Sequence, residues 1–316
     1  MNKRHTLAAL LLGTSLILPS LALAADTSEL DRALRIAAAI DDDDELVALI
    51  ERGANINAGN AFGKTALMNA VENGNLVAAS MLISMGADVN AHMRDGCTAL
   101  TFAAENGKGE LTALLLERGA DVEARTRSGQ TPLMLAARYG QAAMAEQLLF
   151  KGAKVSQIDT DGRDALMLAA ARGHANVVTE LLKGGANPTA KDKKGRTALV
   201  HAASEEGNAD TLALLLRAGA LVDAKANDGS TALIWAAANG HRGSVKLLLD
   251  HGAQINHQDS DGLSALMEAV AANSDDTVRL LVSRGAKSEL KDNDGKTALD
   301  LARRKPDILW ILESAQ

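Results

Sequence analysis

The chain has 316 residues, of which 47% are apolar, 23% are charged and only 2% are aromatic. These proportions exclude a wholly disordered chain, and the single cysteine excludes a scaffold held by intramolecular disulfides. The formal net charge of −7 argues against nucleic-acid binding, which needs a basic surface. A core rich in Ala and Leu but poor in aromatic residues indicates helices whose backbones approach closely.

Residues 1–24 have the features of a signal peptide. Lys3 and Arg4 supply a positive start, an apolar stretch follows, and Ala22-Leu23-Ala24 offers small residues for cleavage after Ala24. The apolar stretch is shorter than the ~20 residues that span a bilayer, so we expect no membrane insertion after cleavage. Cleavage takes the formal charge from −7 to −9 and leaves an exported protein. The periplasm is the expected compartment, and full secretion is the alternative.

Two short motifs recur at a fixed spacing through the rest of the chain. A Gly-Ala pair occurs eight times, at spacings of 33, 33, 33, 33, 34, 33 and 33 residues, beginning at Gly53 and ending at Gly285. A second motif follows a glycine in each period, as in Thr98-Ala99-Leu100 and Thr131-Pro132-Leu133. A fixed period of this size predicts a stack of repeated structural units.

These residues resemble the ankyrin repeat, whose hallmarks are a Gly-x-Thr-Pro-Leu-His-x-Ala-Ala run and a later Leu-Leu-x-x-Gly-Ala. Residues 131–137 (TPLMLAA) match the first hallmark, and residues 148–153 (LLFKGA) match the second. The resemblance extends from about residue 30 to residue 316. It implies an all-α solenoid of helix-turn-helix-loop units, in which the loop tips and the first helices form a concave binding surface.

The residue types within each unit agree with this arrangement. Thr, Asp or Ser at the start of each first helix is a good N-cap, and Pro132 suits a first turn because its missing N–H costs nothing there. Paired alanines such as Ala136-Ala137 keep one helix face thin, so that neighbouring units stack closely. A glycine such as Gly140 ends the first helix, where a left-handed residue is favoured, and Asn273 replaces it in the last full unit.

The period predicts one repeat domain over residues 25–316. Its parts are an amino-terminal cap of about residues 28–62, seven full repeats over 63–294 and a carboxy-terminal cap over 295–316. Trp310 and Ile311 are expected to close the core at the end of the stack. An extra residue near Glu205-Glu206 should bulge the turn in its unit without breaking the stack. Nine layers of about one helix diameter each predict a rod on the order of 90 Å long.

The sequence contains no motif that indicates an enzyme, a cofactor site or a metal site. Residues 59–65 (GNAFGKT) are one residue too short for a phosphate-binding loop, and the acidic loops lack the Glu that completes a calcium loop. His92 and Cys97 are only loosely spaced for a metal site. We therefore expect no catalysis, no cofactor and no metal. Cys97 lies beside Gly96 at an expected loop tip, either as a tolerated free thiol or in an intermolecular disulfide.

Basic residues concentrate on four neighbouring loop tips between Arg125 and Ser230, although the chain as a whole is acidic. The local excess is +6 at the outer tip positions, or +4 when Asp159 and Asp192 are included. The resemblance places these tips beside the concave groove, together with basic and aromatic residues of the first helices. The candidate partner-binding residues are Arg125, Arg127, Arg138, Tyr139, Arg163, Arg172, Lys191, Lys193, Lys194, Arg196, Lys225 and Trp235.

The sequence thus predicts a non-enzymatic scaffold that binds another protein with an acidic surface. Two plainer interpretations stay open: the tip charges form an ordinary solvated surface, and Trp235 packs between units rather than anchoring a partner. Three other biological roles also stay open. The chain resembles some periplasmic ankyrin proteins that support a catalase and peroxide resistance; it could instead be an immunity protein against an exported toxin, or a secreted effector.

Overall fold

The computed structural model describes residues 18–205 and 208–314. These residues form eighteen α-helices, and their only β-type pairings are two isolated bridges, which confirms the predicted all-α solenoid. The helices are α1 (Leu18–Ile40), α2 (Asp43–Glu51), α3 (Ala66–Asn73), α4 (Leu76–Ser84), α5 (Ala99–Asn106), α6 (Gly109–Glu117), α7 (Pro132–Arg138), α8 (Ala142–Phe150), α9 (Ala165–Ala171), α10 (Ala175–Lys183), α11 (Ala198–Ala203), α12 (Ala209–Arg217), α13 (Ala232–Ala238), α14 (Arg242–Asp250), α15 (Ala265–Ala271), α16 (Asp275–Ser283), α17 (Ala298–Ala302) and α18 (Pro306–Glu313).

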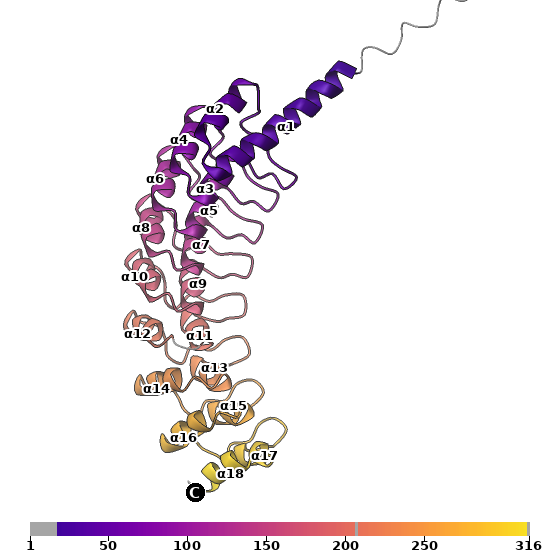
Figure 1. The fold of residues 1–316 in the computed structure, drawn as a ribbon. Coiled ribbons are helices and arrows are strands. Elements are labelled where there is room, and N and C mark those ends of the chain that lie inside the picture. Colours follow the sequence, from indigo (N-terminus) through magenta and orange to yellow (C-terminus); the bar gives the residue numbers. More distant parts are fainter. Residues whose placement is uncertain (1–17, 206–207, 315–316) are drawn as a thin grey trace, which may run out of the picture.

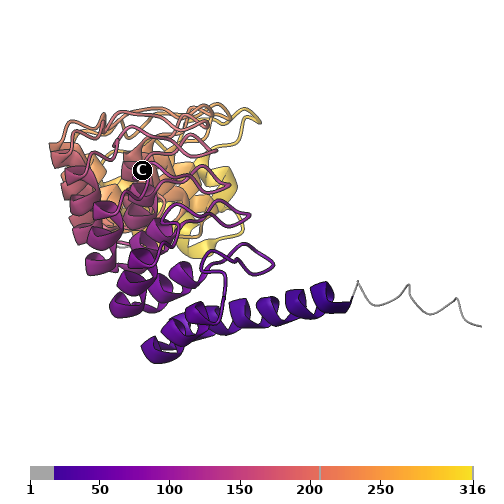
Figure 2. The same ribbon diagram turned by 90° about the horizontal axis from the view of Figure 1, so that it is seen from above.

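The helices stack in two rows (Figure 1). From α3 onward, the odd-numbered helices form an inner row, and the even-numbered helices form the outer, convex edge. The loops between units project on the inner side in one row (Figure 1), and seen from above they fan out from one unit to the next (Figure 2). Each helix packs against its partner within the unit and against the equivalent helix of the next unit. The loops and the inner helices therefore face the concave side of the arc.

Buried alanines bring consecutive inner helices together. One alanine at the same position of five successive inner helices has no exposed surface: Ala103, Ala136, Ala169, Ala202 and Ala236. Leucines such as Leu148 and Leu181 of the outer helices complete one core cluster that runs along the whole stack. Because the alanine side chains are short, the helix backbones approach closely and the few aromatic rings are not needed to fill space.

The inner helices from α3 to α17 begin at a capping side chain, and most of them end near a left-handed residue. The Thr131 hydroxyl accepts a hydrogen bond from the Met134 N–H at 3.3 Å, and Pro132 occupies the first turn as expected. Gly140 has φ 77° and Asn273 has φ 57°, so the predicted left-handed positions are confirmed at both residue types. This conformation turns the chain sharply from the inner helix into the outer one.

A ladder of backbone hydrogen bonds joins consecutive loop tips. The N–H group near the apex of one tip donates to a carbonyl of the preceding tip, at distances of 2.5–3.0 Å. The donor–acceptor pairs are Arg94–Phe62, Arg127–Asp95, Thr160–Ser128, Lys193–Asp161, Asn227–Lys194, Ser260–Asp228 and Asn293–Asp261. The tips are thus fixed relative to one another by main-chain atoms.

Polar side chains connect the units on the helix side as well. The residue after the left-handed turn reaches a carbonyl at the end of the preceding inner helix: His174 Nε2 lies 3.1 Å from the Arg138 carbonyl oxygen, and His241 Nδ1 lies 3.2 Å from that of Ala203. Asn75 makes the equivalent bond to Ala38 at 2.9 Å. These histidines therefore serve the packing of neighbouring units.

The amino-terminal end begins with a helix longer than the others. Helix α1 starts at Leu18 and continues across the predicted cleavage position after Ala24, and its first half projects beyond the stack (Figures 1 and 2). The side chains that α1 is seen to bury begin at Leu30. Most of the predicted signal peptide lies outside the described residues, and so do Glu206 and Gly207 of the predicted bulge. No described helix combines the length and the hydropathy needed to cross a bilayer.

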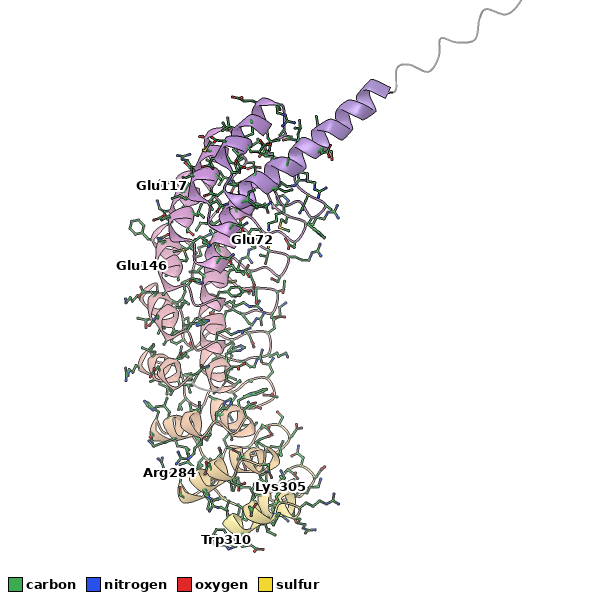
Figure 3. The ribbon with its side chains drawn as sticks, viewed as in Figure 1. Glu72, Glu117, Glu146, Arg284, Lys305 and Trp310 are labelled. Atoms are coloured by element: carbon green, nitrogen blue, oxygen red, sulfur yellow. The ribbon has the colours of Figure 1, made fainter. Side chains whose placement is uncertain are left out.

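The prediction that Trp310 closes the core is wrong. Its side chain is 62% exposed at the carboxy-terminal end of the stack (Figure 3). Helix α18 buries Ile308, Ile311 and Leu312, which are spaced i, i+3 and i+4 and so form one face. Trp310 lies outside that face, with its ring centroid 5.7 Å from the Arg279 guanidinium. Ile311 is buried, as expected.

Enlarging one buried alanine should therefore destabilise the stack. We expect Ala136→Leu to lower the free energy of unfolding by about 1–3 kcal/mol, because the added atoms must push neighbouring inner helices apart. Ala143→Leu is the matched control, since Ala143 is exposed on the adjacent outer helix. Urea unfolding followed by circular dichroism measures both variants. Equal unfolding midpoints for the two would contradict the close alanine contact.

Candidate protein-binding surface

Hydrogen bonds from the backbone to an aspartate fix the shape of two of the basic loop tips. The Asp159 carboxylate accepts backbone hydrogen bonds from Asp161 and Arg163, each at 2.9 Å. Asp192 holds the next tip in the same way, through the N–H groups of Lys194 and Arg196. The tips are therefore tight turns that present their remaining side chains from a fixed backbone.

Two of the predicted partner-binding cations are bound to acids of their own tips. Arg163 lies 2.8 Å from Asp159 and 2.9 Å from Asp161, and Arg196 lies 3.0 Å from Asp192. Asp159 and Asp192 are only 5% and 6% exposed. The two arginines neutralise buried carboxylates, so they contribute to tip structure and add little charge to the outer surface.

His201 adds a second contact to one of these acids. Its Nε2 atom lies 3.0 Å from the Asp192 carboxylate oxygen that also binds Arg196. Burial lowers the pKa of His201, and the Arg196 charge acts in the same direction against the hydrogen bond with Asp192. Burial on its own would raise the pKa of Asp192, but backbone bonding and the charges of Arg196 and His201 outweigh it, so that pKa is lowered.

Four further predicted cations donate hydrogen bonds to backbone carbonyls of a neighbouring tip while their side chains stay at the surface. These contacts are Arg125 to Ile158 at 2.9 Å, Arg127 to Arg94 at 3.3 Å, Lys191 to Lys225 at 2.8 Å and Lys193 to Thr160 at 2.6 Å. Carbonyl acceptors leave the positive charge uncompensated. These side chains therefore cross-link the tips and still contribute to a positive surface.

The remaining predicted cations have no acidic partner among the described residues. Lys194, Lys225 and Arg172 are exposed, and their side chains make no hydrogen bond or ion pair with another described residue. Arg138 lies beside Tyr139, with its guanidinium 5.7 Å from the ring centroid. Tyr139 is 43% exposed, and its hydrogen bond with Glu105, followed by burial, raises its pKa. Its hydroxyl is therefore protonated at neutral pH.

On the concave side these residues form two parallel rows, called rims here, and the surface between the rims is called the floor. The tips border the start of the inner helices, whereas Arg138, Tyr139 and Arg172 lie at the opposite end, about 10 Å away along a seven-residue helix. Leu135, Leu168 and His201 occupy equivalent positions between the rims and are nearly buried. Trp235 continues this column on α13. Its indole packs partly against the core, and its Nε1 is shielded without an acceptor among the described residues.

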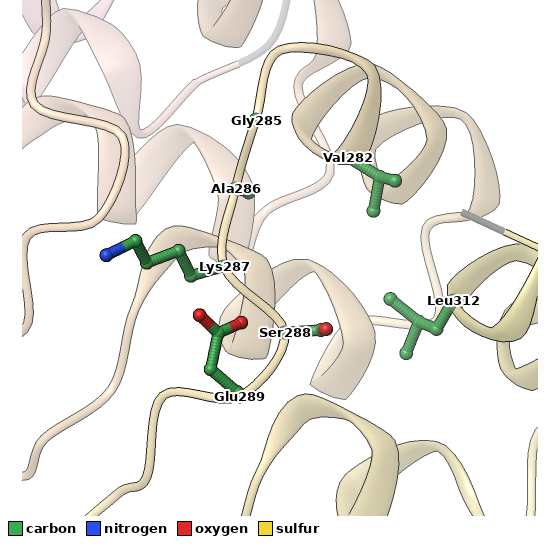
Figure 4. A pocket seen from close by; sticks show the side chains of 7 residues that line it. All are labelled: Val282, Gly285, Ala286, Lys287, Ser288, Glu289 and Leu312. Atoms are coloured by element: carbon green, nitrogen blue, oxygen red, sulfur yellow. The ribbon is translucent and has the colours of Figure 1, made fainter. Parts of the chain in front are cut away.

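Other places on the molecule offer less for binding. Burial, followed by the nearby Asp95 charge, raises the pKa of the half-buried Cys97 thiol to about 11, so it is protonated at neutral pH. Within residues 18–205 and 208–314 no three His, Cys, Asp or Glu side chains gather to hold a metal ion. A pocket of about 430 Å³ lies at the carboxy-terminal end of the stack (Figure 4). It is lined by Val282, Gly285, Ala286, Lys287, Ser288, Glu289 and Leu312, away from the basic tips.

A sequence pattern distinguishes the cations that pair with an acid of their own tip from those that have no acidic partner. Arg163 and Arg196 each follow an aspartate by four residues across a glycine turn, and both pair with that aspartate. Lys194 and Lys225 have no acid at that spacing. The role of Glu105 as a hydrogen-bond partner of Tyr139 has no comparable signal, because the two residues are brought together only by stacking of adjacent units.

A family model described as ankyrin repeats (3 copies) matches overlapping segments along nearly the whole chain. The segments are residues 10–93, 34–126, 86–159, 133–226, 166–259, 201–292 and 254–315. The chain belongs to the ankyrin repeat family. This membership makes it a protein–protein interaction scaffold, and it agrees with the two rows of helices and projecting loops. A comparison with curated proteins finds no match.

The His201 contact predicts a pH dependence of the stability of this ankyrin repeat protein. The pKa of His201 is lowered in the folded state. Below pH 6.5 this histidine is therefore protonated to a greater extent in the unfolded chain than in the folded chain. The free energy of unfolding should fall as pH drops from 7.5 to 5, by about 1.4 kcal/mol for each unit by which the pKa is lowered. His201→Gln keeps a donor for Asp192 and should show a smaller fall in urea titrations. Identical pH profiles for the two proteins would count against this.

Proposed function

We propose that this ankyrin repeat protein is a non-catalytic scaffold whose concave side binds an acidic surface of another protein. The observation that carries the proposal is the set of exposed cations without acidic partners, Lys194 and Lys225 on the tips and Arg172 on the opposite rim. The two lysines lie on loop tips that the backbone ladder holds in place, and Arg172 caps the end of the inner helix α9. A partner would therefore meet positive charges that are already arranged.

The distribution of charge supports an acidic partner. The whole chain carries a formal charge of −7, so a positive concave surface would attract acids locally while the rest of the molecule repels them. Complementary charge of this kind contributes more to association rate and specificity than to affinity. Tyr139 can contribute affinity, since exposed aromatic side chains beside arginines are frequent anchors of interfaces.

Reversing the charges of the two lysines tests this proposal. We expect the double variant Lys194→Glu and Lys225→Glu to capture at least about tenfold less of the partner from a periplasmic extract, because like charges would then face each other. Neither side chain makes a hydrogen bond or ion pair that the fold requires, unlike Arg196. Lys151→Glu with Lys154→Glu makes the same change in net charge at two exposed residues that follow the outer helix α8, and it is the matched control.

Quantitative mass spectrometry of the captured proteins gives the readout. The protein whose yield falls in the tip variant, stays constant in the control and falls as salt rises is the partner. Equal yields from both variants would overturn the assignment of the concave surface. The identity of the partner also separates the roles of a catalase accessory factor, an immunity protein and an effector.

Export to the periplasm is part of the same proposal. Cleavage after Ala24 would shorten α1 but leave Leu30, Leu34, Ala37 and Ala38, the residues of α1 that are seen to pack against the stack. We expect the protein from an osmotic-shock fraction to begin at Ala25, as read by amino-terminal sequencing. A chain that begins at Met1 and stays with the spheroplasts would contradict export.

A further inference from the structure

Four loop tips have the same kind of turn, in which an aspartate side chain accepts hydrogen bonds from the backbone. In three of these tips a basic residue of the same tip also forms an ion pair. Asp159, Asp192, Asp259 and Asp292 each accept backbone hydrogen bonds from the residues two and four positions later. In three tips that later residue is Arg163, Arg196 or Lys296, and each of these pairs with an acid of its own tip. Equivalent positions in these four tips can therefore be compared directly.

The tip at Asp259 is the exception. Leu263 stands where the other tips carry Arg or Lys, and Glu268 stands on α15 where α9 has Leu168 and α11 has His201. Asp259, Asp261 and Glu268 make no ion pair with any described residue. Asp259 is half-buried, whereas Asp159 and Asp192 are fully buried beneath their arginines. This tip therefore retains the acids and lacks the guanidinium that covers them elsewhere.

The neighbouring inner helix carries an aromatic residue at the position equivalent to Glu268. Trp235 occupies on α13 the position that Glu268 occupies on α15, and these two helices pack against each other. The indole is half-buried and continues the floor of the concave surface. Burial, followed by the charges of Asp259 and Asp261, raises the pKa of Glu268. A cation in this place would relieve the repulsion between the carboxylates and could stack on the ring.

We propose that these acids, Asp259 and Glu268, bind an arginine side chain of the partner. Its guanidinium would take the place that Arg196 fills two repeats earlier, between the Asp259 and Glu268 carboxylates and beside Trp235. A planar guanidinium suits paired carboxylates and an aromatic face better than a compact ammonium group does. The described side chains do not converge closely enough for a metal ion. That the arginine belongs to a protein partner rests on the proposed function, whereas the site itself does not.

Trp235 provides a direct readout of occupancy. The chain has two tryptophans, so Trp310→Phe leaves Trp235 as the only one, and Trp310 is exposed at the far end of the stack. We expect N-acetyl-arginine amide to change the fluorescence of this variant in a saturable way, with millimolar affinity. N-acetyl-citrulline amide has nearly the same shape without the charge and should bind at least tenfold more weakly. An equal response to the two probes, or to Ca²⁺ in place of the arginine probe, would overturn the proposal.

Two variants in the same background locate the site. Glu268→Gln should weaken binding of the arginine probe at least tenfold, and Leu263→Arg should abolish it because the chain then fills the site itself. Lys151→Glu is the control, because Lys151 is exposed just after the outer helix α8, and it should leave binding unchanged. Binding that survives both site variants would overturn the assignment.

Urea unfolding of the variants shows whether a loss of binding is due to a loss of folding. Glu268→Gln should raise the urea midpoint by removing a repelled carboxylate, and Leu263→Arg should not lower it, because Arg fits this position in two other tips. Lower midpoints for both would contradict a site that lacks a cation. If the charge-reversal capture fails while the probe binds, the proposed function fails and the arginine site stands.

Discussion

The close contact between buried alanines of successive inner helices is the constraint on which the rest of the structure depends. An inner helix such as α7 has only seven residues, too few to be stable in isolation, and a single unit cannot bury its own apolar face. Stability therefore comes from contacts between neighbouring units, as expected for a solenoid. The same contacts fix the spacing of the loop tips, because a larger residue at Ala136 would separate two tips as well as two helices.

Side chains of the same chemical type have different tasks on the concave side. Arg163 and Arg196 neutralise buried carboxylates, whereas Lys194 and Lys225 have no such partner. Counting charges along the sequence treats these four residues alike. Hydrogen-bond geometry separates them, and it moves the centre of the positive surface toward the later tips and the rim at Arg172. The acids at Asp259 and Glu268 then give the far end of the same surface the opposite sign.

The fold was largely predictable because its determinants are local and periodic. The Gly-Ala spacing, the N-caps and the left-handed residues predicted helices, turns and stacking order, and the left-handed Asn273 was confirmed. Trp310 was mispredicted because a large apolar residue near the end of a chain suggests a cap, whereas its place on α18 depends on which helical face meets α16. The candidate site was only partly predictable. Its charges are visible in the sequence, but their partners across units, such as Glu105 for Tyr139, depend on contacts between residues more than thirty positions apart.

The backbone ladder between tips has a consequence for how this surface can change. Because main-chain atoms make these hydrogen bonds, most side chains at the tip apices can be exchanged without loss of the contacts that align them. The aspartates that brace individual tips are the exception. Selection can therefore alter the recognised partner one repeat at a time, while the stack keeps its shape. A library randomised at the apices, with alanines, glycines and bracing aspartates held constant, would use the same separation of roles.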